Sequence, residues 1–151
     1  MDRAQSCLLR RGRFSQPGGI YLLTTVTHQR KQIFTQLQLA RSVIQQFRLA
    51  EIDGLCHSLA WVVMPDHVHW LIELRDATLC CLMRRFKSRS SHALYRQGMR
   101  RERIWQPGYQ DRALRREESV LKVARYIVAN PIRAGLVGRA GDYSHWDAVW
   151  L

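Results

Sequence analysis

Two strand-like stretches separated by only two residues constrain this chain more than any other feature of its sequence. Residues 55–64 and 67–74 are rich in apolar and β-branched side chains, and Pro65 and Asp66 stand between them. Pro and Asp favour tight turns, and so short a connection joins antiparallel neighbours. The sequence therefore predicts a β-hairpin, around which any fold of this chain has to be built.

Strand-like and helix-like stretches alternate along the rest of the chain. The pattern predicts a strand over residues 20–27, helices over 35–52, 78–96 and 117–130, and a loop with a short edge strand over 104–114. This order favours an α+β fold, a ferredoxin-like sandwich in which an antiparallel sheet carries its helices on one face. We expect a basic arm at residues 1–19 and a single domain over residues 20–151.

The chain is strongly basic, and almost all of its positive charge comes from arginine. Its 151 residues include 24 Lys and Arg against 12 Asp and Glu, a formal net charge of +12, and only Lys31, Lys87 and Lys122 are lysines. Guanidinium groups bind phosphates through two parallel hydrogen bonds and stack on bases, so nucleic acid is the expected partner. A GC-rich genome would also favour arginine codons, but codon usage does not account for the net charge.

Two groups of basic residues are the candidates for DNA binding. Arg10, Arg11 and Arg13 lie in the arm, and Arg84, Arg85, Lys87 and Arg89 lie on the second predicted helix. For each of them alone, a solvated charged face is an alternative interpretation. In the loop that follows, Trp105 and Tyr109 either stack on unpaired bases or fill the core.

His67 and His69 are separated by one residue at the start of a predicted strand. Side chains two positions apart on a strand point to the same face, so both imidazoles lie within reach of one metal ion, while Val68 points the opposite way into the core. The alternative is two histidines on the solvated face of a hairpin, because a His-x-His pair alone is a weak signal.

The third predicted helix offers two further polar groups. Tyr126 and Asn130 lie one turn apart, outside the apolar stripe of the helix. Tyr126 could instead cover the edge of the helix with its ring, and Asn130 could cap the helix before Pro131. Together with the histidines they would supply two imidazoles, an amide oxygen and a phenol, a set that suits Mg2+ or Mn2+ and, less well, Zn2+ acting on a phosphodiester.

Three stretches, in this order and spacing, resemble the REP-associated tyrosine transposases. They are MPDHVHWLIEL at residues 64–74, IWQPGYQD at 104–111 and YIVANPIRAGLV at 126–137, and residues 20–34 add to the likeness. These enzymes belong to the HUH single-tyrosine transposases and are related to insertion-sequence enzymes that move as single-stranded DNA. The resemblance covers residues 20 to about 146 and implies the HUH endonuclease fold.

The resemblance also implies a role for each candidate residue. His67 and His69 match the histidines that hold a divalent metal, Mg2+ or Mn2+, and Asn130 matches the amide-bearing third ligand. Tyr126 matches the nucleophile, which attacks a DNA phosphate and leaves a 5′-phosphotyrosine and a free 3′-OH. The implied substrate is single-stranded DNA next to a palindromic hairpin, cut and rejoined without a nucleotide cofactor by a monomer or a homodimer.

Two other functions fit the same residues. The chain could be a domesticated protein that binds hairpin DNA without cutting it, or a metallophosphodiesterase that uses water in place of Tyr126. No apolar stretch approaches the roughly 20 residues that span a bilayer. We therefore expect a cytoplasmic, nucleoid-associated protein with no membrane partner.

Overall fold

The structure is a computed structural model that describes residues 15–115 and 117–150. Its strands and α-helices are, in chain order, β1 (Ile20–Val26), α2 (Leu37–Ile52), β2 (Cys56–Val63), β3 (His67–Leu74), α3 (Leu79–Arg96), β4 (Gln110–Leu114), α4 (Glu117–Val128), α5 (Asn130–Arg133) and β5 (Trp146–Ala148). Short 3-10 turns lie at η1 (His28–Arg30), η2 (Ile33–Thr35) and η3 (Ala140–Asp142). The predicted order of elements is confirmed as far as α4. Within the described residues, no helix is long and apolar enough to cross a membrane.

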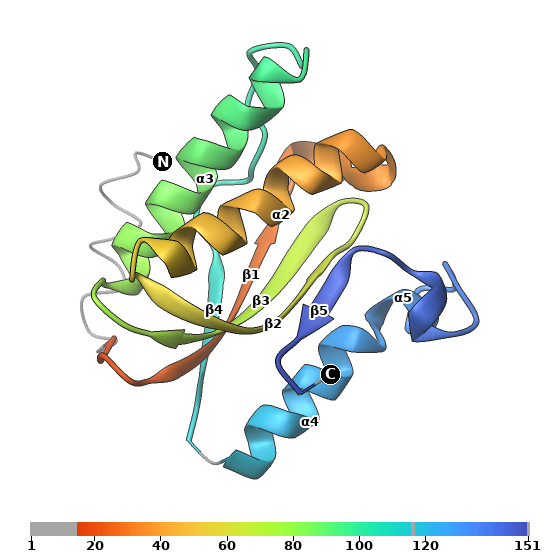
Figure 1. Ribbon diagram of the computed structural model, residues 1–151. Coiled ribbons are helices and arrows are strands. Elements are labelled where there is room, and N and C mark those ends of the chain that lie inside the picture. Colours follow the sequence, from red (N-terminus) through yellow and green to blue (C-terminus); the bar gives the residue numbers. More distant parts are fainter. Residues whose placement is uncertain (1–14, 116, 151) are drawn as a thin grey trace.

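The strands form one antiparallel sheet in the order β4, β1, β3, β2, β5 (Figure 1). β3 lies between β1 and β2, which therefore run parallel to each other and are connected through α2. β1 in turn lies between β3 and β4, which are connected through α3. Two such split βαβ units give the ferredoxin-like arrangement, so the predicted α+β class and antiparallel sheet are confirmed.

Helices cover both faces of this sheet, and the prediction that they lie on one face is wrong (Figure 1). α2 and α3 pack on one face, in a core cluster that contains Trp70 and Ile72 of β3. α4 packs on the opposite face, in a second cluster that joins Ile127 to Val62 and Leu71. The physical reason is that β2 and β3 carry apolar side chains on both faces, and both faces then need cover from water.

The core under α2 and α3 is built around aromatic rings. Phe47 of α2 stacks on Phe86 of α3 with ring centroids 5.3 Å apart and an interplanar angle of 4°. Its ring also lies 4.8 Å from that of Trp70 and 5.4 Å from that of Trp61. Phe47 therefore joins both helices to β2 and β3.

Trp105, in the loop before β4, completes this core. Its side chain is 5% exposed, its ring lies 5.6 Å from Phe34 and 5.7 Å from Phe86, and its Nε1–H donates to Ser90 Oγ at 2.9 Å. Tyr109 packs partly buried against the same cluster. For Trp105, filling the core is the interpretation that the structure confirms, whereas Tyr109 is only partly buried.

Two features of the C-terminal part of the chain depart from the sequence prediction. The expected third helix ends at Val128 rather than at residue 130, and Asn130 begins the separate helix α5. The glycine-rich tail then returns to the sheet as β5, which pairs Trp146 with Val62 and Ala148 with Ala60. A strand of three residues after several glycines has too little period-2 pattern to be recognised from sequence.

Replacing Phe47 with alanine should destabilise the fold strongly, because it removes the ring that packs against Phe86, Trp61 and Trp70. We expect the free energy of unfolding to fall by about 3–5 kcal/mol, measured by urea denaturation. Ile52→Ala on the same helix is the control, because this side chain is 76% exposed, and it should change the free energy of unfolding by less than about 0.5 kcal/mol. Equal losses for the two variants would contradict this description of the core.

Candidate functional site

His67 and His69 lie beside each other at the start of β3, on the face of the sheet that α4 covers. Their ring centroids are 4.9 Å apart and the rings are nearly perpendicular, at 79°. Val68 between them is 1% exposed and points into the core under α2 and α3. The predicted alternation is therefore confirmed, and the two imidazoles are close enough to bind one ion.

Each of the two histidines uses its Nδ1 for a hydrogen bond with a neighbouring side chain. His67 Nδ1 lies 2.7 Å from Asp66 Oδ1. His69 Nδ1 lies 2.8 Å from the hydroxyl of Thr24, its partner across the pairing of β1 with β3. These contacts orient both rings and leave the Nε2 of each as the nitrogen that could bind a metal, the arrangement usual for metal-binding histidines.

Asp66 is held through both its backbone and its side chain. The Thr27 backbone N–H donates to its carbonyl oxygen at 2.9 Å. The Thr27 hydroxyl lies 3.0 Å from the same oxygen and 2.8 Å from the Lys31 carbonyl oxygen, and Arg30 Nη1 lies 3.3 Å from Asp66 Oδ2. Burial alone would raise the pKa of Asp66, but the hydrogen bond and charge of His67, together with Arg30, outweigh burial and lower the pKa. The carboxylate is therefore ionised at neutral pH and can accept the Nδ1–H of His67.

The turn that carries Arg30 to this carboxylate has an unusual backbone. Within η1, Gln29 and Arg30 have φ angles of 57° and 50°, in the left-handed region that residues with a Cβ rarely adopt. Such strain persists only where the surrounding contacts hold it. Here the hydrogen bond from Arg30 N–H to Thr27 O, at 3.0 Å, closes the turn, and the ion pair with Asp66 holds its end.

His69 is neutral at neutral pH. Burial, and then the positive charges of His67 and Arg133, lower its pKa to about 4. A neutral imidazole offers the lone pair that a metal requires, so no proton has to be displaced from this ring when a metal binds at neutral pH.

Tyr126 lies beside the histidines and is open to solvent. Its ring centroid is 6.5 Å from that of His69, with an interplanar angle of 65°, and its side chain is 52% exposed. The next residue, Ile127, is fully buried against the sheet. Tyr126 therefore lies outside the apolar stripe of α4, as the sequence predicts, with its ring next to that of His69, and its role as the nucleophile stays a prediction.

Asn130 lies one turn beyond Tyr126, at the first position of α5, with a partly buried side chain. Its role as a ligand stays a prediction. Among the described side chains of residues 15–115 and 119–150, no three of His, Cys, Asp or Glu converge. A metal bound to His67 and His69 would therefore complete its coordination with other groups, such as an amide oxygen, water or phosphate.

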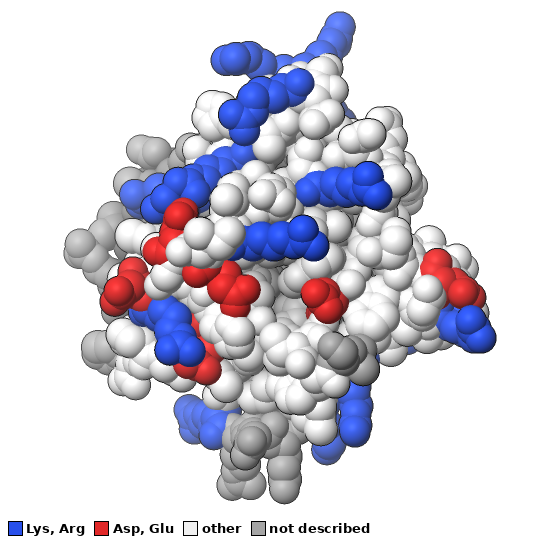
Figure 2. Space-filling model, viewed as in Figure 1, with Lys and Arg blue, Asp and Glu red and all other residues white. Residues whose placement is uncertain are grey.

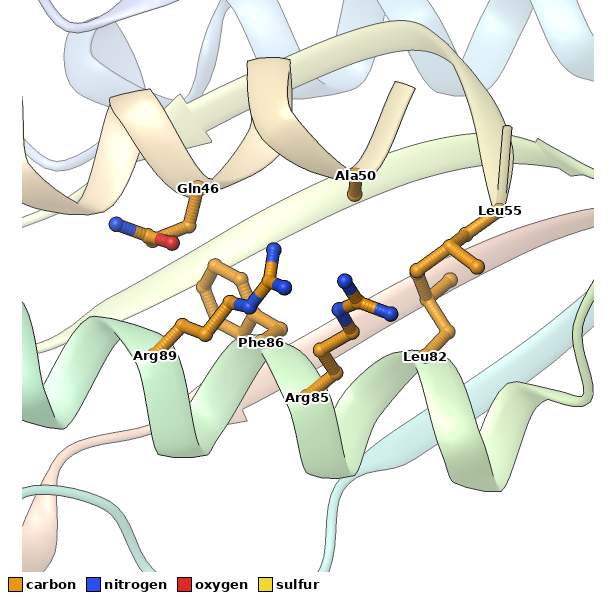
Figure 3. A pocket seen from close by; sticks show the side chains of 7 residues that line it. All are labelled: Gln46, Ala50, Leu55, Leu82, Arg85, Phe86 and Arg89. Atoms are coloured by element: carbon orange, nitrogen blue, oxygen red, sulfur yellow. The ribbon is translucent and has the colours of Figure 1, made fainter. Parts of the chain in front are cut away.

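The predicted DNA-binding residues of α3 lie on the opposite face of the sheet from Tyr126. Arg84 is exposed, while Arg85 and Arg89 each donate to Asp53 Oδ2 at 2.9 Å. Figure 3 shows these two side chains beside the shallow pocket between α2 and α3 that they line. Figure 2 shows Lys and Arg side chains crossing the surface over both helices, with acidic side chains gathered beside them.

The other members of the predicted set have different positions. Lys87 Nζ donates to the backbone carbonyls of Gln106 and Gly108, so its ammonium holds the loop before β4 against α3 rather than pointing to solvent. Arg10, Arg11 and Arg13 lie outside the described residues.

Four residues of the site were missed by sequence reasoning. Asp66 appears in the sequence only as a turn residue, although it directly precedes His67. Thr24 becomes visible only once the strand register is known. Arg30 and Arg133 reach the site through changes of backbone direction that no periodicity encodes, and Arg133 Cζ lies 3.7 Å from the ring centroid of Tyr126.

Comparison with known proteins gives concordant matches. The family described as "Transposase IS200 like" matches residues 16–130, a range that contains both histidines, Tyr126 and Asn130. A REP-associated tyrosine transposase of Escherichia coli K12 is 30% identical over 138 residues, which cover 87% of this chain and 77% of that relative.

Two solved structures share the fold. A REP-associated tyrosine transposase bound to a REP hairpin matches with a TM-score of 0.71 and 28% identity, over 89% of this chain and 79% of the other. A putative transposase from Deinococcus radiodurans R1 matches with a TM-score of 0.57 and 19% identity, over 76% of this chain and 92% of the other. The resemblance inferred from the sequence motifs is confirmed, and the chain belongs to the family of IS200-like transposases.

Proposed function

We propose that the protein is a metal-dependent single-stranded DNA endonuclease and strand transferase that acts at palindromic hairpin DNA through a 5′-phosphotyrosine intermediate. The observation that carries the proposal is the exposed phenol of Tyr126 beside two imidazoles whose Nδ1 atoms are already engaged. Membership of the family supports a transposase, and a similar protein in complex with a REP hairpin supports hairpin DNA as the substrate.

The transfer step exchanges one phosphoester bond for another. The phenol oxygen of Tyr126 attacks the scissile phosphorus and loses its proton to solvent, while the bond between phosphorus and the 3′ oxygen breaks and that oxygen takes up a proton. The products are a 5′-phosphotyrosine and a free 3′-OH. Attack of a 3′-OH on the phosphotyrosine reverses the step and rejoins DNA, so no nucleotide cofactor is needed.

His67 and His69, through Nε2, and the amide oxygen of Asn130 would hold Mg2+ or Mn2+. The ion would supply positive charge to the scissile phosphate. The amide oxygen suits these hard ions, and the set leaves coordination positions for the water and phosphate oxygens that they prefer. Asp66 and Thr24 would keep the two imidazoles in the tautomer that offers Nε2 to the ion.

Tyr126→Phe should abolish covalent attachment to DNA, because it removes the attacking oxygen and little else. The measurement is a denaturing gel after incubation with a labelled hairpin oligonucleotide and Mg2+ or Mn2+. If the unaltered protein binds the hairpin but forms no covalent adduct, the proposal is contradicted and the protein only binds DNA. Cleavage that survives in Tyr126→Phe would instead indicate a phosphodiesterase that uses water.

Asp66→Asn and Thr24→Val should each weaken Mn2+ binding by about 10–100-fold, because the first removes the carboxylate charge that makes His67 a stronger ligand and the second removes the hydrogen bond that orients His69. Isothermal titration calorimetry of the protein without DNA measures this directly. Asp76→Asn is the matched control, since Asp76 is exposed just beyond the far end of β3. Unchanged affinity in both test variants would exclude this orienting role.

We further propose that Arg84, Arg85 and Arg89, together with Arg10, Arg11 and Arg13 of the arm, bind DNA phosphates. Lys87 is left out because its ammonium is engaged with loop carbonyls. Replacing Arg84, Arg85 and Arg89 together with alanine should reduce the slope of log Kd against log salt by about two to three, because each phosphate that the protein neutralises contributes about 0.7–0.9 to that slope. Arg139→Ala, which removes an exposed cation paired with Asp142, should leave the slope unchanged. An unchanged slope in the triple variant would exclude this surface.

A further inference from the structure

Arg133 reaches Tyr126 because the chain changes direction between them. In a straight helix, residues seven apart would be separated by about 10 Å along the axis. Here α4 ends at Val128, and Pro131 stands at the start of α5, where its ring fits a new helix but not the interior of an old one. The guanidinium carbon of Arg133 consequently lies 3.7 Å from the centroid of the Tyr126 ring.

Two contacts fix Arg133 against the tyrosine. Its guanidinium covers the ring face in a cation–π contact, and its Nη2 donates to the backbone carbonyl of Tyr126 at 2.6 Å. Because Tyr126 is 52% exposed, the guanidinium restricts the motion of a ring that is otherwise half open to solvent.

Among the described side chains, which do not include those of residues 116–118, no carboxylate forms an ion pair with Arg133. In this it differs from six arginines that each form an ion pair with an Asp or Glu, namely Arg30, Arg75, Arg85, Arg89, Arg100 and Arg139. A cation with no carboxylate partner among the described side chains thus lies against the phenol ring.

We infer that Arg133 is a further residue of the strand-transfer site, which holds the Tyr126 ring in position for attack and contacts the scissile phosphate with its remaining N–H donors. The inference rests on the proposed function. A guanidinium carries five N–H donors in a planar fork that matches phosphate oxygens. One donor bonds to the Tyr126 carbonyl. The others remain available to the scissile phosphate, the strongly anionic group of the DNA.

Arg133 neither takes nor gives a proton in the step. Negative charge increases on the non-bridging phosphate oxygens as the phenol oxygen attacks, and a fixed cation stabilises that charge more than it stabilises the bound substrate. Its removal should therefore slow formation of the phosphotyrosine far more than it weakens hairpin binding.

The test compares Arg133→Ala and Arg133→Lys with Arg139→Ala, in the full chain with Mn2+ and a hairpin oligonucleotide. The rate of adduct formation is measured in a single turnover, and hairpin affinity is measured separately. Arg133→Ala should form adduct about 100-fold more slowly, the usual effect of losing one charge-stabilising donor. Arg133→Lys should recover only part of the rate, because an ammonium lacks the planar fork, and Arg139→Ala should react as fast as the unaltered protein.

Added guanidinium ion at millimolar concentration gives a second readout, which a purely structural role would not move. It should restore part of the rate in Arg133→Ala and none in Tyr126→Phe. Equal adduct rates for Arg133→Ala and the unaltered protein would overturn the role of Arg133 alone. The role of Arg133 would also be overturned if Arg133→Ala were slow, Arg133→Lys were equally slow and added guanidinium restored no activity, because Arg133 would then only stabilise the fold. Failure of the unaltered protein to form adduct would overturn the proposed function and this inference with it.

Discussion

The antiparallel pairing of β1 with β3 determines where the residues of the candidate site lie. It sets Thr24 opposite His69 and Val26 opposite His67. Because side chains alternate along a strand, a slip of one residue would turn both histidines toward α2 and α3 and move Val68 out of the core. Val68 and Trp70 are each 1% exposed, so burial of apolar residues that have no part in the chemistry fixes the register on which the chemistry depends.

The sequence correctly predicts the hairpin, the order of elements and the fold class, because all three follow from local patterns. The face on which α4 packs does not follow from its own pattern, because an apolar stripe shows that a helix is buried but not on which side of a sheet. The signal lay in β2 instead. Residues 60–64, AWVVM, form a continuous apolar run, which is typical of a strand covered on both faces.

The same distinction applies to the site. His67, His69 and Tyr126 become candidates through their spacing, since strand periodicity sets both histidines on one face and helix periodicity sets Tyr126 outside the apolar stripe. Thr24 lies 45 residues from the histidine that it orients, so its role depends on tertiary pairing. The contact of Arg133 with Tyr126 depends on the end of α4, a boundary that periodicity predicts poorly.

The packing of α4 explains how an exposed tyrosine can still be held in a defined place. Adjacent residues on a helix point about 100° apart, so the full burial of Ile127 against Val62 and Leu71 fixes the rotation of the helix. That rotation directs Tyr126 toward His69. Tyr126 remains open to solvent, as the proposed attack on a DNA strand requires, while its buried neighbour Ile127 holds the helix rigidly. The proposed binding of DNA by arginines requires only charge over a broad surface. The proposed transfer to Tyr126 requires a precisely placed phenol, and apolar contacts beneath the candidate site provide that precision.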